Sequence, residues 1–180
     1  MNVFNNFGKV EEFVPISVLA DGKYLISFNK VNLTEEEVIL KNSRYVSTGR
    51  MIPTGNATWQ SIVFNSKPTV GLIEKTIFEI IDNKTVNLIT NAFKWKGNSV
   101  YLSKENQMNY KNAFDLAVST EGENLPVVFK FAKNGKPVYY SFDTINELKE
   151  FYVAMSKHIS NCLEAGWKEK DKFDRNDYKI

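Results

Sequence analysis

Short apolar runs rich in β-forming residues fill the first third of the chain and predict a small antiparallel sheet. The candidate strands are residues 23–28, 38–40, 44–46 and 59–64. Asp21-Gly22 supplies a turn before the first of them, and Thr34 is placed to cap a short helical turn formed by the three glutamates that follow. Residues 47–58 carry Thr, Gly, Pro and Asn, so they predict a long exposed loop.

A pattern typical of a helix begins at Pro68. Proline is favourable in the first helical turn, because the N–H that it lacks would have no hydrogen-bond partner within the helix. Apolar residues then recur with the i, i+4 spacing of one helix face, at Leu72, Ile73, Ile77, Ile80 and Ile81. Asn83 is expected to break or kink this helix, which gives a predicted extent of residues 68–82.

A hairpin followed by a helix is predicted twice in the remaining chain. The first hairpin turns through residues 96–99, and the second through Asn134-Gly135, the strongest short hairpin signal. Ser103 is a suitable N-cap for the first helix. Thr144 and Glu147 form a capping box for the second, which is expected to stop at Gly166 as a C-terminal cap.

These patterns predict an α+β fold: a small N-terminal antiparallel sheet, then a twice-occurring ββα arrangement that ends in a long C-terminal helix. A boundary is expected near residues 66–68. It would separate a β-rich region, 1–67, from an α+β region, 68–180. The alternative is that both regions form a single domain.

The composition mainly excludes some classes of protein and of partner. Of the 180 residues, 43% are hydrophobic and 24% charged, which is typical of a globular protein. The 23 basic and 21 acidic residues leave a formal charge of +2, so no bulk field favours nucleic acid. Lys94, Trp95 and Tyr101 resemble part of a single-strand binding surface, but acidic residues interrupt the basic ones nearby. Without a signal-peptide pattern or an apolar run of membrane-spanning length, synthesis in the cytoplasm and no membrane partner are expected.

One cysteine and one histidine leave little catalytic chemistry. His158 and Cys162 lie one helical turn apart, a spacing that a nucleophile pair could use. Both follow the apolar stripe of the last helix, which favours a packing role. Zinc needs three or four ligands, and the chain has no second His or Cys, although a carboxylate such as Glu164 could add one. The acidic residues at 35–37 and after residue 163 are predicted to be solvated. The expectation is a protein without enzymatic activity, metal or cofactor.

Trp167 follows the presumed cap at Gly166. A hydrophobic contact back onto the helix often accompanies such a cap. We therefore expect a buried Trp167 ring, followed by a charged, solvated tail.

Several stretches resemble small uncharacterised proteins encoded among the virion and tail genes of bacteriophages and prophages of gut bacteria. They include residues 18–25, 92–111, 114–117, 125–131, 137–142 and 163–171. The resemblance as a whole covers about half the chain, whereas residues 29–67 match poorly. The shared motifs are hairpins, caps and aromatic anchors. The resemblance implies a virion or tail-associated component, and it transfers no catalytic residue.

On this reading the chain is a structural component of a bacteriophage virion, of the tail or the head-tail connector. It would act by contacts with other virion proteins and with its own copies in a closed ring. The segments left free for contacts are 1–12, 47–58 and the tail after Trp167, and the candidate contact residues are Phe4, Phe7, Met51 and Ile52. The alternative is a phage-encoded regulator or anti-defence protein that binds a host macromolecule.

Overall fold

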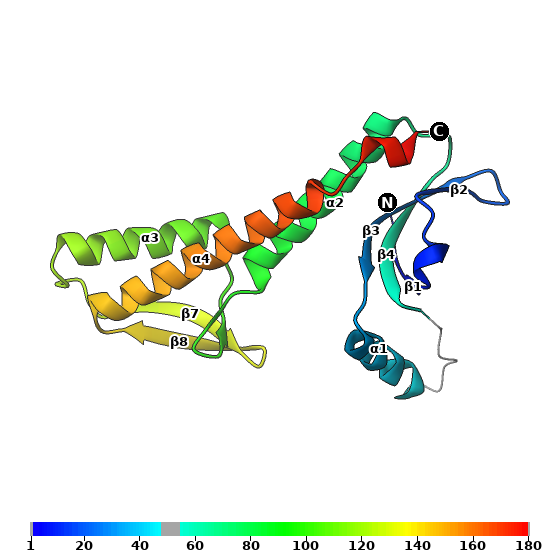
Figure 1. Cartoon of the computed structure of the whole chain (residues 1–180). Helices are drawn as coiled ribbons and strands as arrows, with labels where there is room; N and C mark the ends of the chain where they lie inside the picture. The colour runs from blue at the N-terminus through cyan, green and yellow to red at the C-terminus, as the bar shows by residue number, and fades with distance from the viewer. Residues whose placement is uncertain (1, 48–54, 180) are drawn as a thin grey trace. The chain divides into compact units, whose positions relative to one another are not determined.

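The computed structural model describes residues 2–47 and 55–179, and the described chain combines helices with two antiparallel sheets, confirming the α+β fold (Figure 1). It divides into two compact units. The first unit is Met1–Glu79 with Glu169–Ile180, and the second unit is Ile80–Lys168. The final residues of the chain therefore belong with the N-terminal sheet.

The sheet of the first unit has the order β1-β4-β3-β2. Its strands are β1 (Val3–Gly8), β2 (Ile16–Val18), β3 (Tyr24–Asn32) and β4 (Ala57–Phe64), with a 3-10 turn η1 (Val10–Glu12) after β1. Ile26 lies opposite Ile62 in the β3–β4 register. Since strand side chains alternate between faces, these two and Phe28 and Phe64 lie on one face, and all four are buried.

Residues 38–40 and 44–46 are not strands, contrary to the sequence prediction, because both lie in the helix α1 (Glu35–Ser47). The predicted cap at Thr34 explains why. The Thr34 backbone N–H donates to Glu37 Oε2 at 2.9 Å, and the Glu37 N–H donates to Thr34 Oγ1 at 3.3 Å. This reciprocal capping box starts a helix, which then continues through residues whose local preference favours a strand.

Gly55 is the first described residue after Ser47. The next residue, Asn56, donates its N–H to the Gly8 carbonyl at 3.0 Å. A Cβ on Gly55 would lie 2.7 Å from that same carbonyl oxygen, so the two segments can approach this closely only with glycine there. Both ends of the predicted loop lie in regular elements, because α1 extends to Ser47 and β4 begins at Ala57, and residues 48–54 lie outside the described residues.

The helix α2 (Val70–Asn91) begins two residues after the predicted start at Pro68, with the Leu72 N–H donating to Thr69 Oγ1 at 3.2 Å. It does not break at Asn83, contrary to the prediction. The Asn83 side chain is exposed, while Ile81 and Thr85 on either side of it are buried. Burial of the flanking residues outweighs the weak helix preference of one exposed asparagine.

Both predicted ββα arrangements are present in the second unit. Their elements are β5 (Lys94–Trp95), β6 (Asn98–Ser99), α3 (Lys104–Ser119), β7 (Val127–Lys133), β8 (Lys136–Phe142) and α4 (Ile145–Lys170). Ser103 caps α3 as expected, accepting from the Asn106 N–H at 3.2 Å. The two hairpins join through Ser99 and Ala132 into one sheet, β5-β6-β7-β8.

Positive φ angles at both turn residues explain the two hairpins. Lys96 and Gly97 have φ of 45° and 81°, and Asn134 and Gly135 have φ of 52° and 75°. Two consecutive residues with positive φ are what a two-residue type I′ hairpin needs. The first connection is therefore tighter than the predicted span of residues 96–99.

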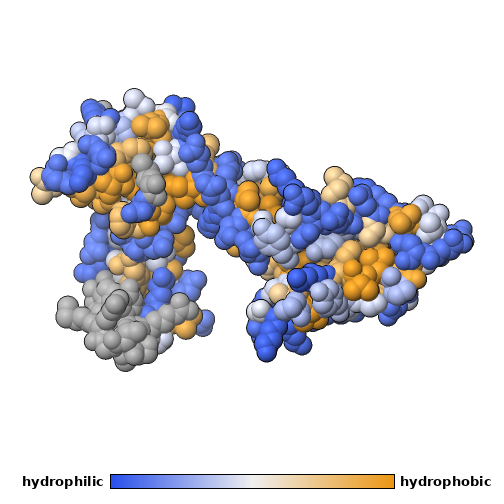
Figure 2. Space-filling view, turned by 180° about the vertical axis from the view of Figure 1, so that it is seen from behind, coloured by the Kyte–Doolittle hydropathy of each residue, from blue (hydrophilic) through white to orange (hydrophobic). Residues whose placement is uncertain are grey.

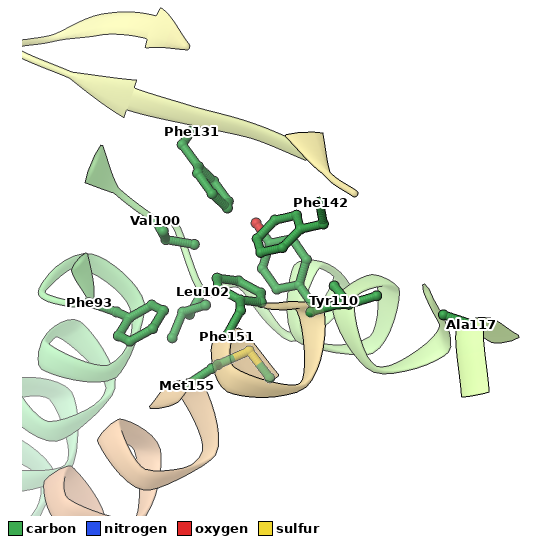
Figure 3. Close-up of a cluster of buried hydrophobic side chains, with 10 residues drawn as sticks. Phe93, Val100, Leu102, Tyr110, Ala117, Phe131, Phe142, Phe151 and Met155 are labelled. Atoms are coloured by element: carbon green, nitrogen blue, oxygen red, sulfur yellow. The ribbon is translucent and has the colours of Figure 1, made fainter. Parts of the chain in front are cut away.

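Aromatic rings fill the core of the second unit (Figure 3). Phe151 of α4 is fully buried at its centre. Its ring centroid lies 5.1 Å from that of Phe142, 5.2 Å from that of Tyr110 and 5.7 Å from that of Phe131. Residues from a helix of each ββα arrangement and from the second hairpin thus meet around one side chain.

Gly166 does not end α4, contrary to the prediction, because the helix continues to Lys170. Gly166 is buried, and a Cβ there would lie 2.5 Å from Thr85 Oγ1 of α2. The glycine therefore allows two helices to pack closely and does not act as a C-terminal cap. With the helix still running, Trp167 points away from the core and is 60% exposed, so the predicted buried anchor is wrong.

Candidate functional site

The candidate contact residues of the N-terminal segment lie on β1. Phe4 is 49% exposed, and Phe7 is half-buried with the Lys41 ammonium 5.5 Å from the centre of its ring. β1 pairs with β4 along its whole length, from Val3 opposite Ile62 to Gly8 opposite Ala57. The other two candidates, Met51 and Ile52, lie outside the described residues.

Exposed apolar side chains occur on both units, and the more hydrophobic residues form orange areas on the face shown in Figure 2. The most exposed are Val18, Ile39 and Leu40 in the first unit, and Val86, Tyr139 and Trp167 in the second. On α4, Leu163 and Trp167 are four residues apart and share a helix face. Exposed apolar side chains of this kind are suited to contacts with another protein.

The C-terminal tail is not a free contact segment, contrary to the sequence expectation. Tyr178, in the 3-10 turn η2 (Arg175–Tyr178), is only 5% exposed, and its hydroxyl donates to the Ser27 carbonyl at 3.0 Å. Its ring stacks on Phe173 with centroids 4.8 Å apart. Phe173 in turn meets Phe78 edge-on at 5.7 Å. Two aromatic residues of the tail, Phe173 and Tyr178, together with Phe78 of α2, thus hold the tail in the first unit.

The returning tail and β3 border a cleft of about 230 Å³ in the first unit. On its rim, Asn29 Nδ2 donates to Glu169 Oε1 at 2.5 Å and to Gln60 Oε1 at 2.9 Å. Lys30 lies 5.2 Å above the Phe13 ring. Burial, reinforced by nearby Asp177, raises the pKa of Tyr178 to about 12. Asn29 bonds to Glu169 and the Tyr178 hydroxyl bonds to the Ser27 carbonyl, so residues that line this cleft hold the tail.

Asn29 marks a signal that the sequence analysis missed. It has a φ of 55°, and the β3–β4 register shifts immediately after Phe28. A β-bulge at a residue that tolerates positive φ redirects the strand. The Asn-Lys pair inside an otherwise regular strand pattern was the available clue.

His158 and Cys162 lie together, as their spacing predicts. His158 Nε2 is 3.2 Å from the Leu88 carbonyl oxygen and 3.7 Å from Cys162 Sγ, and its ring lies 5.3 Å from that of Phe93. Burial raises the pKa of the Cys162 thiol. A nucleophilic cysteine needs the opposite shift, so this geometry supports packing.

We therefore expect Cys162 to react slowly with a thiol reagent. Labelling at pH 7.5 should be slower in the folded protein than in urea, because the thiol is half-buried and its pKa is raised. Ellman's reagent measures both rates. Labelling faster than that of the unfolded chain would instead indicate an activated thiol.

Glu147 does not complete the predicted capping box with its side chain. Its N–H donates to Thr144 Oγ1 at 3.2 Å, but its carboxylate accepts from Lys96 Nζ at 2.5 Å and from the Tyr140 hydroxyl at 2.6 Å. The bond from Lys96, and then that from Tyr140, holds the pKa of Glu147 below its usual value. The carboxylate connects the first hairpin turn to the start of α4, which is a structural role.

Within residues 2–47 and 55–179, no three His, Cys, Asp or Glu side chains gather as a metal site would require. No helix there is both long and apolar enough to cross a bilayer. The sequence matches no protein-family model, no curated protein and no solved structure.

Proposed function

We propose that the chain is a structural component of a bacteriophage virion, of the tail or the head-tail connector, that acts through protein-protein contacts. The observation that supports this function is the exposure of large apolar side chains on regular elements of both units. Trp167 is 60% exposed on α4, and Tyr139 is 70% exposed on β8. Tryptophan and tyrosine are the residues that most often carry binding energy at protein interfaces.

Trp167 is the clearest of these positions. It projects from a helix whose packing is provided by other residues, including the buried Gly166 directly before it. Leu163 shares its helix face. Val86, which is 60% exposed, follows the Thr85 that contacts Gly166. An apolar group of this kind gains its full transfer free energy only when a second protein covers it.

Mass spectrometry of purified particles tests the proposal. The phage or prophage that carries the gene would be induced, and its particles purified and compared with the cleared lysate. A virion component should be present in the particles at many copies. Enrichment in the lysate with none in the particles would contradict the proposal and favour the regulator or anti-defence protein.

Replacing Trp167 by alanine should impair assembly into particles while leaving folding unchanged. Because the ring is largely exposed, the free energy of unfolding should change by no more than about 0.5 kcal/mol. Incorporation into particles should fall at least several-fold. The matched control is Lys168→Ala, an exposed neighbour on the same helix, which should be incorporated normally. Normal incorporation of Trp167→Ala would exclude this face as a contact.

A further inference from the structure

We propose that two copies of this chain pair along the open edge of β1, forming one continuous antiparallel sheet across a two-fold axis. β1 is the first strand in the order β1-β4-β3-β2. Among the described residues, no strand lies on its outer side. A second copy of the chain is thus one partner for the contacts proposed above, and purified protein is sufficient to test this pairing.

Among the sheet edges, β1 is the one best suited to pairing. An unprotected edge can pair with a strand of another chain, and proteins usually prevent this with short strands, charges or proline. β2 has three residues and β5 has two. β8 begins with Lys136 and Pro137. β1 has six residues, VFNNFG, with neither a charge nor a proline.

The side chains of β1 suit pairing with an identical strand. Asn5 is exposed, and its Oδ1 accepts from Gln60 Nε2 at 3.4 Å, which leaves amide N–H groups to donate. An amide carries both donors and acceptors, so two Asn5 side chains can bond to each other. A strand without charges also avoids the repulsion that like charges produce across a two-fold axis.

Symmetry then selects a register. Around a two-fold axis normal to the sheet, one residue must lie opposite its own copy. With Asn5 on the axis, Val3 lies opposite Phe7 of the second copy, so apolar residues meet twice on one face. With Asn6 on the axis, Asn5 would face Phe7, and with Phe4 on it, Val3 would face Asn5. Of these three registers, only the one with Asn5 on the axis pairs apolar with apolar on that face.

Light scattering coupled to size exclusion tests the pairing. The full chain should elute as a dimer that dissociates on dilution. Asn5→Lys places two ammonium groups opposite each other, and Phe4→Lys adds a charge to the edge, so both variants should be monomeric. The control Ser141→Lys, at an exposed position of the β8 edge, should remain dimeric. A monomeric parent protein, or a dimer that survives both β1 substitutions, would overturn the proposal.

Disulfide trapping tests the register independently of stability. In a Cys162→Ala background, Asn5→Cys should cross-link under mild oxidation, because residues opposite each other in antiparallel strands have Cα atoms about 4.5–5.5 Å apart, within disulfide range. Asn6→Cys should cross-link at least tenfold more slowly. Equal rates for both would contradict the Asn5 register.

The outcomes also separate this proposal from the proposed function. A dimer in solution with no protein in the particles would retain the pairing and refute the virion role. Protein in the particles that is monomeric in solution, with Asn5→Lys incorporated normally, would refute the pairing alone.

Discussion

Phe151→Ala is expected to lower the free energy of unfolding of the second unit by about 3–5 kcal/mol. The ring is fully buried, and rings from α3, β7 and β8 surround it. The cavity cannot collapse easily, because those rings are held by separate elements. Native-state hydrogen exchange measures the loss as a lower opening free energy for the amides of β7 and β8.

Val153→Ala is the matched control for this substitution. Val153 lies two residues further along α4 and is 54% exposed. Its replacement should change the opening free energy by no more than about 0.5 kcal/mol. A similar small change for Phe151→Ala would show that the aromatic cluster does not hold the second unit together.

The stability of the first unit should fall in alkali, and Tyr178→Phe should remove part of that fall. Burial raises the pKa of Tyr178 to about 12 in the folded chain, against about 10 unfolded. Below pH 10 the Tyr178 hydroxyl is protonated in both the folded and the unfolded chain, so its full contribution to stability is present. As the pH rises from 10 to 12, the hydroxyl of the unfolded chain loses its proton first, which favours unfolding. At pH 11 this linkage amounts to about 1.4 kcal/mol.

Urea unfolding followed by Trp59 fluorescence measures this effect. Trp95→Phe and Trp167→Phe would leave Trp59 as the single tryptophan reporter. At neutral pH, Tyr178→Phe should cost about 1 kcal/mol for the lost bond to the Ser27 carbonyl. Between pH 8 and 11, its stability should fall by about 1.4 kcal/mol less than that of the parent. If the free energies of unfolding of the parent and of Tyr178→Phe fell equally between pH 8 and 11, the Tyr178 hydroxyl would titrate normally. The tail would then not be packed as described.

Features encoded within a few residues could be predicted from the sequence. The hairpin at Asn134-Gly135 and the cap at Ser103 formed as expected, and Thr144 caps α4 without the reciprocal side-chain bond from Glu147. Each depends on the backbone freedom or the hydrogen-bonding groups of neighbouring residues. Of the candidate contact residues, Phe4 proved half exposed, in line with its position in a segment outside the predicted core.

Features that depend on distant residues could not be predicted. Gly166 looked like a cap, and only the proximity of Thr85 shows that it is a packing position. Trp167 looked like an anchor, and it became exposed because α4 continues past it. In both cases the local sequence allowed two outcomes.

The sequence by itself determined the α+β class, the two hairpin-helix arrangements and most helix starts, because turn residues, caps and apolar periods act over a few positions. The tertiary structure alone decided that the hairpins share one sheet and that Tyr178 returns to Ser27. The latter contact joins residues 151 positions apart. Its free energy comes from burial against a surface that exists only once the sheet has formed.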